Sequence, residues 1–140
     1  MKPPTDQKET VDDGYGLQFV GKTPEFIQTI IDILQESRDS REKSLESTID
    51  MWEDIVEDDH IKYIKFLEDH LRIGHPFVDL TDPESVAKAT KDIEDAKAKY
   101  ADDKDKFEET KKKEEAAIAH RKAQIVVAKD ALRRAQKSHA

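Results

Sequence analysis

Large apolar residues recur at seven-residue intervals along the C-terminal part of the chain, and this repeat constrains the fold more than any other feature. An α-helix underwound to about 3.5 residues per turn returns to the same side every two turns, so such a repeat keeps one side facing a neighbouring helix. We therefore predict one long helix that packs against a second helix. The residues of this heptad stripe are Val86, Ile93, Tyr100, Phe107, Ile118, Ile125 and Leu132, with four additional residues inserted between Phe107 and Ile118.

Capping residues mark the ends of two predicted helices. Thr81 or Asp82 is suited to cap the long helix, with Pro83 in its first turn, and Thr23 is suited to cap an earlier helix. The earlier helix ends where Gly74 can adopt the left-handed conformation. We predict helices over residues 24–73 and 82–138, a connection over residues 74–81 and a flexible or draped N-terminal arm over residues 1–22.

These two helices predict an all-α fold, a long coiled-coil-like antiparallel hairpin over residues 23–140. Apolar residues on the first helix spread over about half of its circumference, and Val126 and Val127 lie away from the heptad stripe of the second helix. One hairpin leaves such residues uncovered, so we expect two hairpins to pair into a four-helix bundle. The polar run at residues 35–44 permits an alternative, a three-helix bundle broken near Asp39.

The composition limits the classes of partner and of chemistry. The chain has 140 residues, 40% of them charged, a formal net charge of −8 and no cysteine. The overall acidity and the absence of aromatic residues after Phe107 argue against nucleic acid as a partner for the basic segment at residues 111–137. No signal peptide and no apolar run of membrane-spanning length is present, so we expect a soluble chain without membrane insertion. Phosphate-binding and nucleophile motifs are also absent, which predicts no enzymatic activity and no cofactor.

One short motif suggests a metal site. Glu57 and His60 have the Glu-x-x-His spacing that places a carboxylate and an imidazole on one helical face in di-iron bundles, and Glu53 lies one turn earlier. In the expected hairpin, Glu94 or Asp95 lies near His60. The motif occurs once, whereas a di-iron bundle needs two copies and two further glutamates, so an acidic solvated surface is the favoured interpretation and no metal site is predicted.

The predicted N-terminal arm contains alternating apolar residues. Tyr15, Leu17 and Phe19 have the two-residue period of an extended segment, which is typical of a peptide that docks on a partner or covers the protein's own helices. We favour the second interpretation. The full set of predicted interaction residues is Tyr15, Leu17, Phe19, Trp52, Ile64, Val126 and Val127.

The sequence thus predicts a non-catalytic structural or interaction protein, a rigid helical hairpin that acts as a spacer, scaffold or adaptor in a larger assembly. The expected partners are another protein or a second copy of the chain, with a dimer favoured. The alternatives are a metal-binding four-helix bundle and a regulatory binder that acts through its N-terminal arm. We expect Ile93→Asp and Ile125→Asp to cost several kcal/mol by placing a carboxylate in the stripe, and Asp103→Ala to have little effect.

Overall fold

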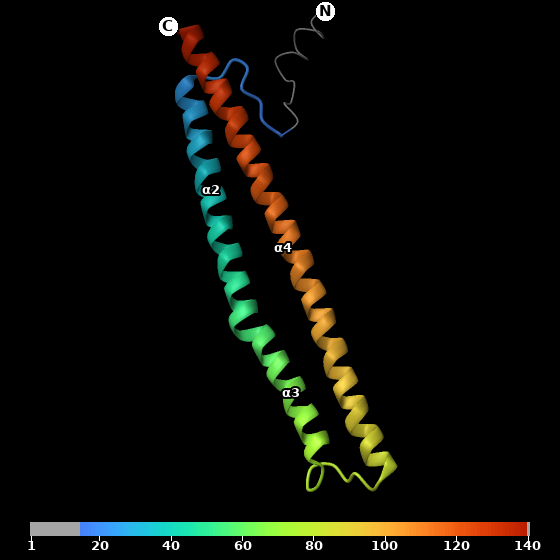
Figure 1. Cartoon of the computed structure of the whole chain (residues 1–140). Helices are drawn as coiled ribbons and strands as arrows, with labels where there is room; N and C mark the ends of the chain where they lie inside the picture. Colours follow the sequence, from blue (N-terminus) through green and yellow to red (C-terminus); the bar gives the residue numbers. More distant parts are fainter. Residues whose placement is uncertain (1–14, 140) are drawn as a thin grey trace, which may run out of the picture. The chain divides into compact units, whose positions relative to one another are not determined.

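The computed structural model describes residues 15–139, and all regular secondary structure in this part of the chain is helical, which confirms the predicted all-α class. The helices pack against one another. Residues 1–14 of the predicted N-terminal arm, and Ala140, lie outside the described residues. The elements are α2 (Pro24–Met51), the π-helical turn η1 (Trp52–Val56), α3 (Glu57–Ile73) and α4 (Pro83–His139) (Figure 1).

Helix α2 begins at the predicted cap. The Phe26 amide donates a hydrogen bond of 3.1 Å to Thr23 Oγ1, and Pro24 and Glu25 occupy the first turn, where a fixed φ and a negative charge are favourable. The helix buries Ile27, Ile31 and Leu34, which lie on one face at helical spacing.

Helix α2 is not interrupted at Asp39. The alternative prediction, a three-helix bundle broken near this residue, is therefore wrong. Helix α2 continues through residues 35–44, which contain neither Gly nor Pro. Arg38 instead pairs along the helix surface with Asp39 and Glu42. Exposed pairs of this kind contribute a few tenths of a kcal/mol each, which supports a polar segment that buries little.

The helical geometry changes at η1, which the sequence analysis did not predict. A π-helical turn contains more residues than an α-helical turn, so it rotates the following residues around the helix axis. Trp52 is buried within η1, at 8% exposure, whereas its neighbours Met51 and Ile55 are exposed. The turn therefore changes which apolar side chains of the first predicted helix face inward.

The connection between α3 and α4 depends on two residues. Gly74 follows α3 with φ 81° and ψ −138°, so its φ is positive as predicted, but its ψ lies in a region that is essentially restricted to glycine rather than in the left-handed helical region. At the start of α4, Asp82 and not Thr81 provides the cap, because Asp82 Oδ1 accepts a 3.1 Å hydrogen bond from the Glu84 amide. Thr81 instead donates through its hydroxyl and its amide to Asp79 Oδ1.

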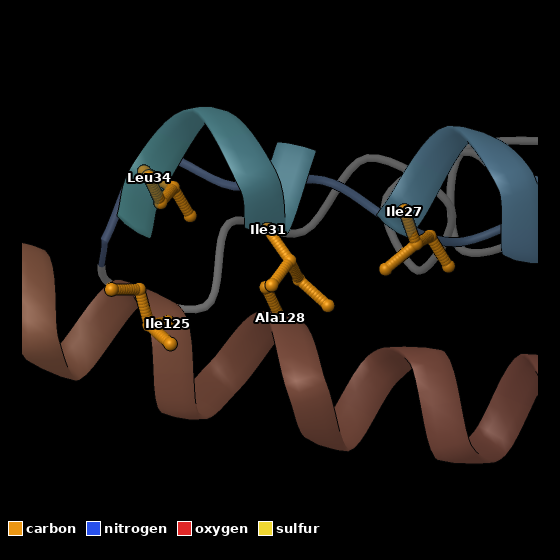
Figure 2. Close-up of a cluster of buried hydrophobic side chains, with 5 residues drawn as sticks. All are labelled: Ile27, Ile31, Leu34, Ile125 and Ala128. Carbon is orange, nitrogen blue, oxygen red and sulfur yellow. The ribbon is translucent and has the colours of Figure 1, made fainter. Parts of the chain in front are cut away.

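The chain divides into two compact units. The first contains the described residues up to Leu45 and those from Lys113 onward, and the second is Glu46–Lys112. In the first unit, a buried cluster forms between α2 and α4. Figure 2 shows its members, which are Ile27, Ile31, Leu34, Ile125 and Ala128.

Helix α4 contributes the heptad stripe to both units. All seven stripe residues are buried or half-buried, with Ile93, Ile118 and Ile125 the least exposed. No Gly or Pro follows Pro83 within the helix, and the insertion between Phe107 and Ile118 is accommodated without a break. A step of four residues is a stutter that keeps the stripe on one side of a continuous helix.

Candidate functional site

A polar cluster lies between α3 and α4 in the second unit, and we name it the His60 cluster (Glu57, His60, Tyr100 and Asp103). His60 Nε2 lies 2.9 Å from Asp103 Oδ2, and the Tyr100 hydroxyl donates a 2.9 Å hydrogen bond to Glu57 Oε2. The His60 and Tyr100 rings are stacked with centroids 5.4 Å apart. All four side chains are half-buried, so these contacts fix the positions of polar groups at the edge of the helix–helix contact.

Aromatic rings border this cluster. The Trp52 and Phe107 rings are nearly parallel, with an interplanar angle of 8° and centroids 4.9 Å apart, and Trp52 lies 6.4 Å from the His60 ring. Offset-stacked rings at such distances add about 0.5 to 1.5 kcal/mol beyond the area they bury. Trp52 therefore anchors η1 against α4 within the second unit.

The hydrogen bond to Glu57 raises the pKa of Tyr100 above its ordinary value of 10.0, with smaller contributions from desolvation and from the Glu57 charge. Each of these effects disfavours the phenolate. The Tyr100 hydroxyl therefore remains a donor into the alkaline range. In the connection between α3 and α4, the hydroxyl and the amide of Thr81 donate hydrogen bonds to the Asp79 carboxylate. These bonds favour the charged form and lower the pKa of Asp79.

The residues considered for a metal site do not come together. Among residues 15–139, no group of three or more His, Asp or Glu side chains is arranged to hold a metal ion. Glu53, Glu57 and His60 therefore do not form such a group. Glu53 is exposed, and the other two contact residues of α4.

The partner of His60 differs from the predicted one. The expected register placed Glu94 or Asp95 near His60, and this is wrong, because Asp103 occupies that position about two helical turns away. Asp103 was expected to be unimportant. Its contact with His60 is a polar link between α3 and α4 that this expectation did not include.

Two of the predicted arm residues lie against the buried cluster of the first unit. Leu17 and Phe19 are half-buried and pack on the cluster of Ile27, Ile31 and Ile125. This agrees with the favoured interpretation, in which the segment covers the protein's own helices. Residues 15–22 form no strand.

A buried polar residue holds this segment in place. Gln124, at 6% exposure, donates through Nε2 to the Tyr15 carbonyl oxygen at 2.7 Å, and its Oε1 accepts from Arg121 at 2.6 Å. Arg121 also donates to Ser37 Oγ on α2, at 3.1 Å. Sequence reasoning missed Gln124, because a glutamine beside a stripe position carries no signal that distinguishes it from a solvated one.

The remaining predicted interaction residues are distributed rather than gathered. Ile64 and Val127 are half-buried in different units, and Val126 is 68% exposed. They do not form one surface within either unit.

Instead, an exposed row of rings runs along α3 and into the connection. The Tyr63 and Phe66 rings lie 6.5 Å apart, Phe66 and His70 lie 3.9 Å apart, and His70 and Phe77 lie 4.0 Å apart. Tyr63, Phe66 and Phe77 are each more than half exposed. These residues were not among the predicted interaction residues, although the spacing of three and four residues along α3 was the available signal.

Comparison with known proteins does not assign the chain to a family: no family model, no curated protein and no solved structure matches it. Within the described part of the chain, no helix combines the length and the apolar character that crossing a lipid bilayer requires. The interpretation of function therefore depends on the surfaces described above.

Proposed function

We propose that the protein is a non-catalytic structural protein, a helical hairpin that serves as a spacer, scaffold or adaptor by binding other protein chains. The observation that carries this proposal is the number of large apolar side chains exposed on α2, η1 and α3. Along α3 the rings of Tyr63, Phe66 and His70 contact one another, so part of this apolar surface is contiguous. Contiguous exposed apolar surface is typical of protein–protein contact sites. The exposed apolar residues include Phe26 and Ile33 in the first unit, and Met51, Ile55, Tyr63, Phe66 and Ile73 in the second.

The order of contacts supports the antiparallel hairpin. In the first unit, Ser37 contacts Arg121 and the later residue Arg41 contacts the earlier residue Glu114. In the second unit, Glu57 contacts Tyr100 and Glu68 contacts Lys97. Trp52 of η1, which precedes Glu57, stacks on Phe107, which follows Tyr100 along α4. Over several helical turns in each unit, advancing along α2, η1 or α3 thus corresponds to moving backward along α4, although contacts within one turn, such as that of His60 with Asp103, do not follow this order. Such an order is typical of two helices that run in opposite directions.

Pairing of two hairpins into a four-helix bundle accounts for the apolar surface that one hairpin leaves exposed. In a four-helix bundle each helix contacts two neighbours, so a helix buries a wider arc than in an isolated pair. Exposed Phe66 and Ile73 lie about 100° or more around α3 from Ile64 and Leu67, which are half-buried. A second contact surface on the same helix is therefore available.

Solution scattering on the full chain tests the proposal. Helix α4 has 57 residues, so a hairpin built on it is roughly 85 Å long and has a radius of gyration of about 25 Å. A compact domain of 140 residues has a radius of gyration of about 14 Å. We expect a value near the former from small-angle X-ray scattering, combined with a molar mass from light scattering. A value near the latter, at a monomer mass, contradicts the hairpin.

A further inference from the structure

The exposed side of α3 has the residue pattern of a second helix–helix contact. Tyr63, Phe66, His70 and Ile73 follow one another at intervals of three and four residues, and we name this set the α3 row. These intervals are those of the a and d positions of a coiled coil, which lie on one side of a helix and pack against a neighbouring helix. Phe66 is 51% exposed, and Tyr63 and Ile73 are similarly exposed, so no helix among residues 15–139 covers these three side chains. His70 is half-buried, with the Phe77 ring stacked on it.

Ring contacts order the α3 row before any partner binds. The Phe66 ring lies edge-on against His70 at 3.9 Å and beside Tyr63 at 6.5 Å. Each aromatic side chain has only two rotatable bonds, and rings already in contact lose little further freedom on association. The row is therefore a preorganised apolar surface.

We propose that the α3 row binds the α3 row of a second copy of the chain, with the two helices antiparallel. This inference builds on the proposed structural function, because it names the surface and the partner for self-association. In the register that we infer, Tyr63 faces the partner's Phe66, and Phe66 faces the partner's Tyr63.

Charge complementarity selects a second copy and this register. Asp59 lies on the same side of α3 as the row, and in this register it falls opposite the partner's His70. At the edge of the row, Lys62 falls opposite the partner's Asp69, and the two-fold axis generates each pair twice. Sliding the helices by about one heptad, so that Tyr63 faces the partner's Ile73, places the two copies of Asp69 against each other. Both registers match apolar residues with apolar residues, but of the two only the first places Lys62 opposite the partner's Asp69.

The charges at this edge are free to exchange partners. Lys62 pairs with Asp58 at 2.8 Å and Asp69 pairs with Arg72 at 3.3 Å, both along the surface of α3. Exposed pairs of this kind contribute little to stability, about 0 to 1 kcal/mol, so replacing or extending them across an interface has a small cost. Partner helices with a single sign of charge along this edge meet repulsion from either Lys62 or Asp69.

Because the chain contains no cysteine, single-cysteine variants of the full-length protein test the register directly. Lys62→Cys and Asp69→Cys are purified separately, then oxidised alone and as an equimolar mixture, and cross-linked dimer is measured by non-reducing electrophoresis. In the inferred register, the mixture forms the cross-link fastest. In a dimer formed by Lys62→Cys alone, the two cysteines lie about 10 Å apart along the helix axis, which is beyond the usual reach of a disulfide. Equal cross-linking in all three samples, or none in the mixture, overturns the proposal.

A second measurement tests the surface without cysteine. Phe66→Asp should convert a dimer to a monomer of 16.1 kDa in light scattering, with unchanged helicity by circular dichroism. Ile61→Asp is the matched control, because Ile61 is 50% exposed but lies about 140° around α3 from Phe66. A wild-type monomer, or a dimer that survives Phe66→Asp, refutes the inference. A monomer that is nonetheless elongated in scattering leaves the proposed hairpin intact, so the two failures are distinguishable.

Discussion

The buried cluster between α2 and α4 makes a sharp prediction about stability. Ile125 is 4% exposed and packs among Ile27, Ile31 and Leu34, whereas the next residue, Val126, is 68% exposed. Replacing Ile125 by alanine removes three carbon atoms from this cluster. At about 0.8 kcal/mol for each buried methylene, the transfer contribution is about 2.4 kcal/mol.

Two further effects adjust this value and partly cancel. The cavity left behind adds to the loss, but a contact between two helices can close more easily than the interior of a large domain, so the addition is at the low end. Alanine also has a higher helix propensity than isoleucine, which returns a few tenths of a kcal/mol. We therefore expect Ile125→Ala to lower the free energy of unfolding by about 2.5 kcal/mol.

The assay is urea denaturation followed by circular dichroism at one protein concentration, with Val126→Ala as the matched control. The control removes two carbon atoms from an exposed side chain and gains helix propensity, so its free energy of unfolding should change by less than about 0.5 kcal/mol. A loss below about 1 kcal/mol for Ile125→Ala, or equal losses for the two variants, refutes the burial argument.

Three further substitutions test the helix ends and the His60 cluster. Gly74→Ala should destabilise the chain by about 2 kcal/mol, because Gly74 has φ 81° and an added Cβ lies 2.8 Å from Leu80 Cδ1; an unchanged urea midpoint contradicts this. Asp82→Ala should cost about 1 kcal/mol through loss of the α4 cap, and Asp82→Asn should retain most of that stability in the same assay. Glu57→Gln should lower the midpoint of the Tyr100 titration, followed by absorbance at 295 nm in a chain with the other two tyrosines replaced by phenylalanine. The hydrogen bond to Glu57 raises the pKa of Tyr100 in the folded chain. The contribution of this bond to the free energy of unfolding is therefore complete below about pH 10 and is lost as the pH rises through the pKa of folded Tyr100. An unshifted titration midpoint in Glu57→Gln contradicts this.

Much of the local structure was predictable from particular residues. Thr23 and Asp82 cap helices where the capping preferences placed them, and Gly74 has the positive φ that ends α3. These features depend on a few consecutive residues, so sequence reasoning has all the information it needs. The choice of Asp82 over Thr81 was left open, because both side chains can cap and only the turn formed with Asp79 engages Thr81.

The candidate contact surfaces were less predictable. Sequence periodicity identified Trp52 as part of an apolar face, but the π-helical turn at η1 decides that it is buried against Phe107 while Ile55 is exposed. Such a turn has no simple sequence signature, and it rotates every later residue of the helix. The three- and four-residue spacing of the α3 row is visible in the sequence, but its outward orientation depends on that rotation.

The sequence by itself determined which side of α4 packs against another helix, because the spacing of apolar residues along one helix is a local property. The tertiary structure alone decided how far the helices are shifted along each other. In the second unit, that shift places Asp103 rather than Glu94 or Asp95 beside His60. A heptad repeat permits several shifts of similar apolar burial, and hydrogen bonds of about 3 Å form in only one of them.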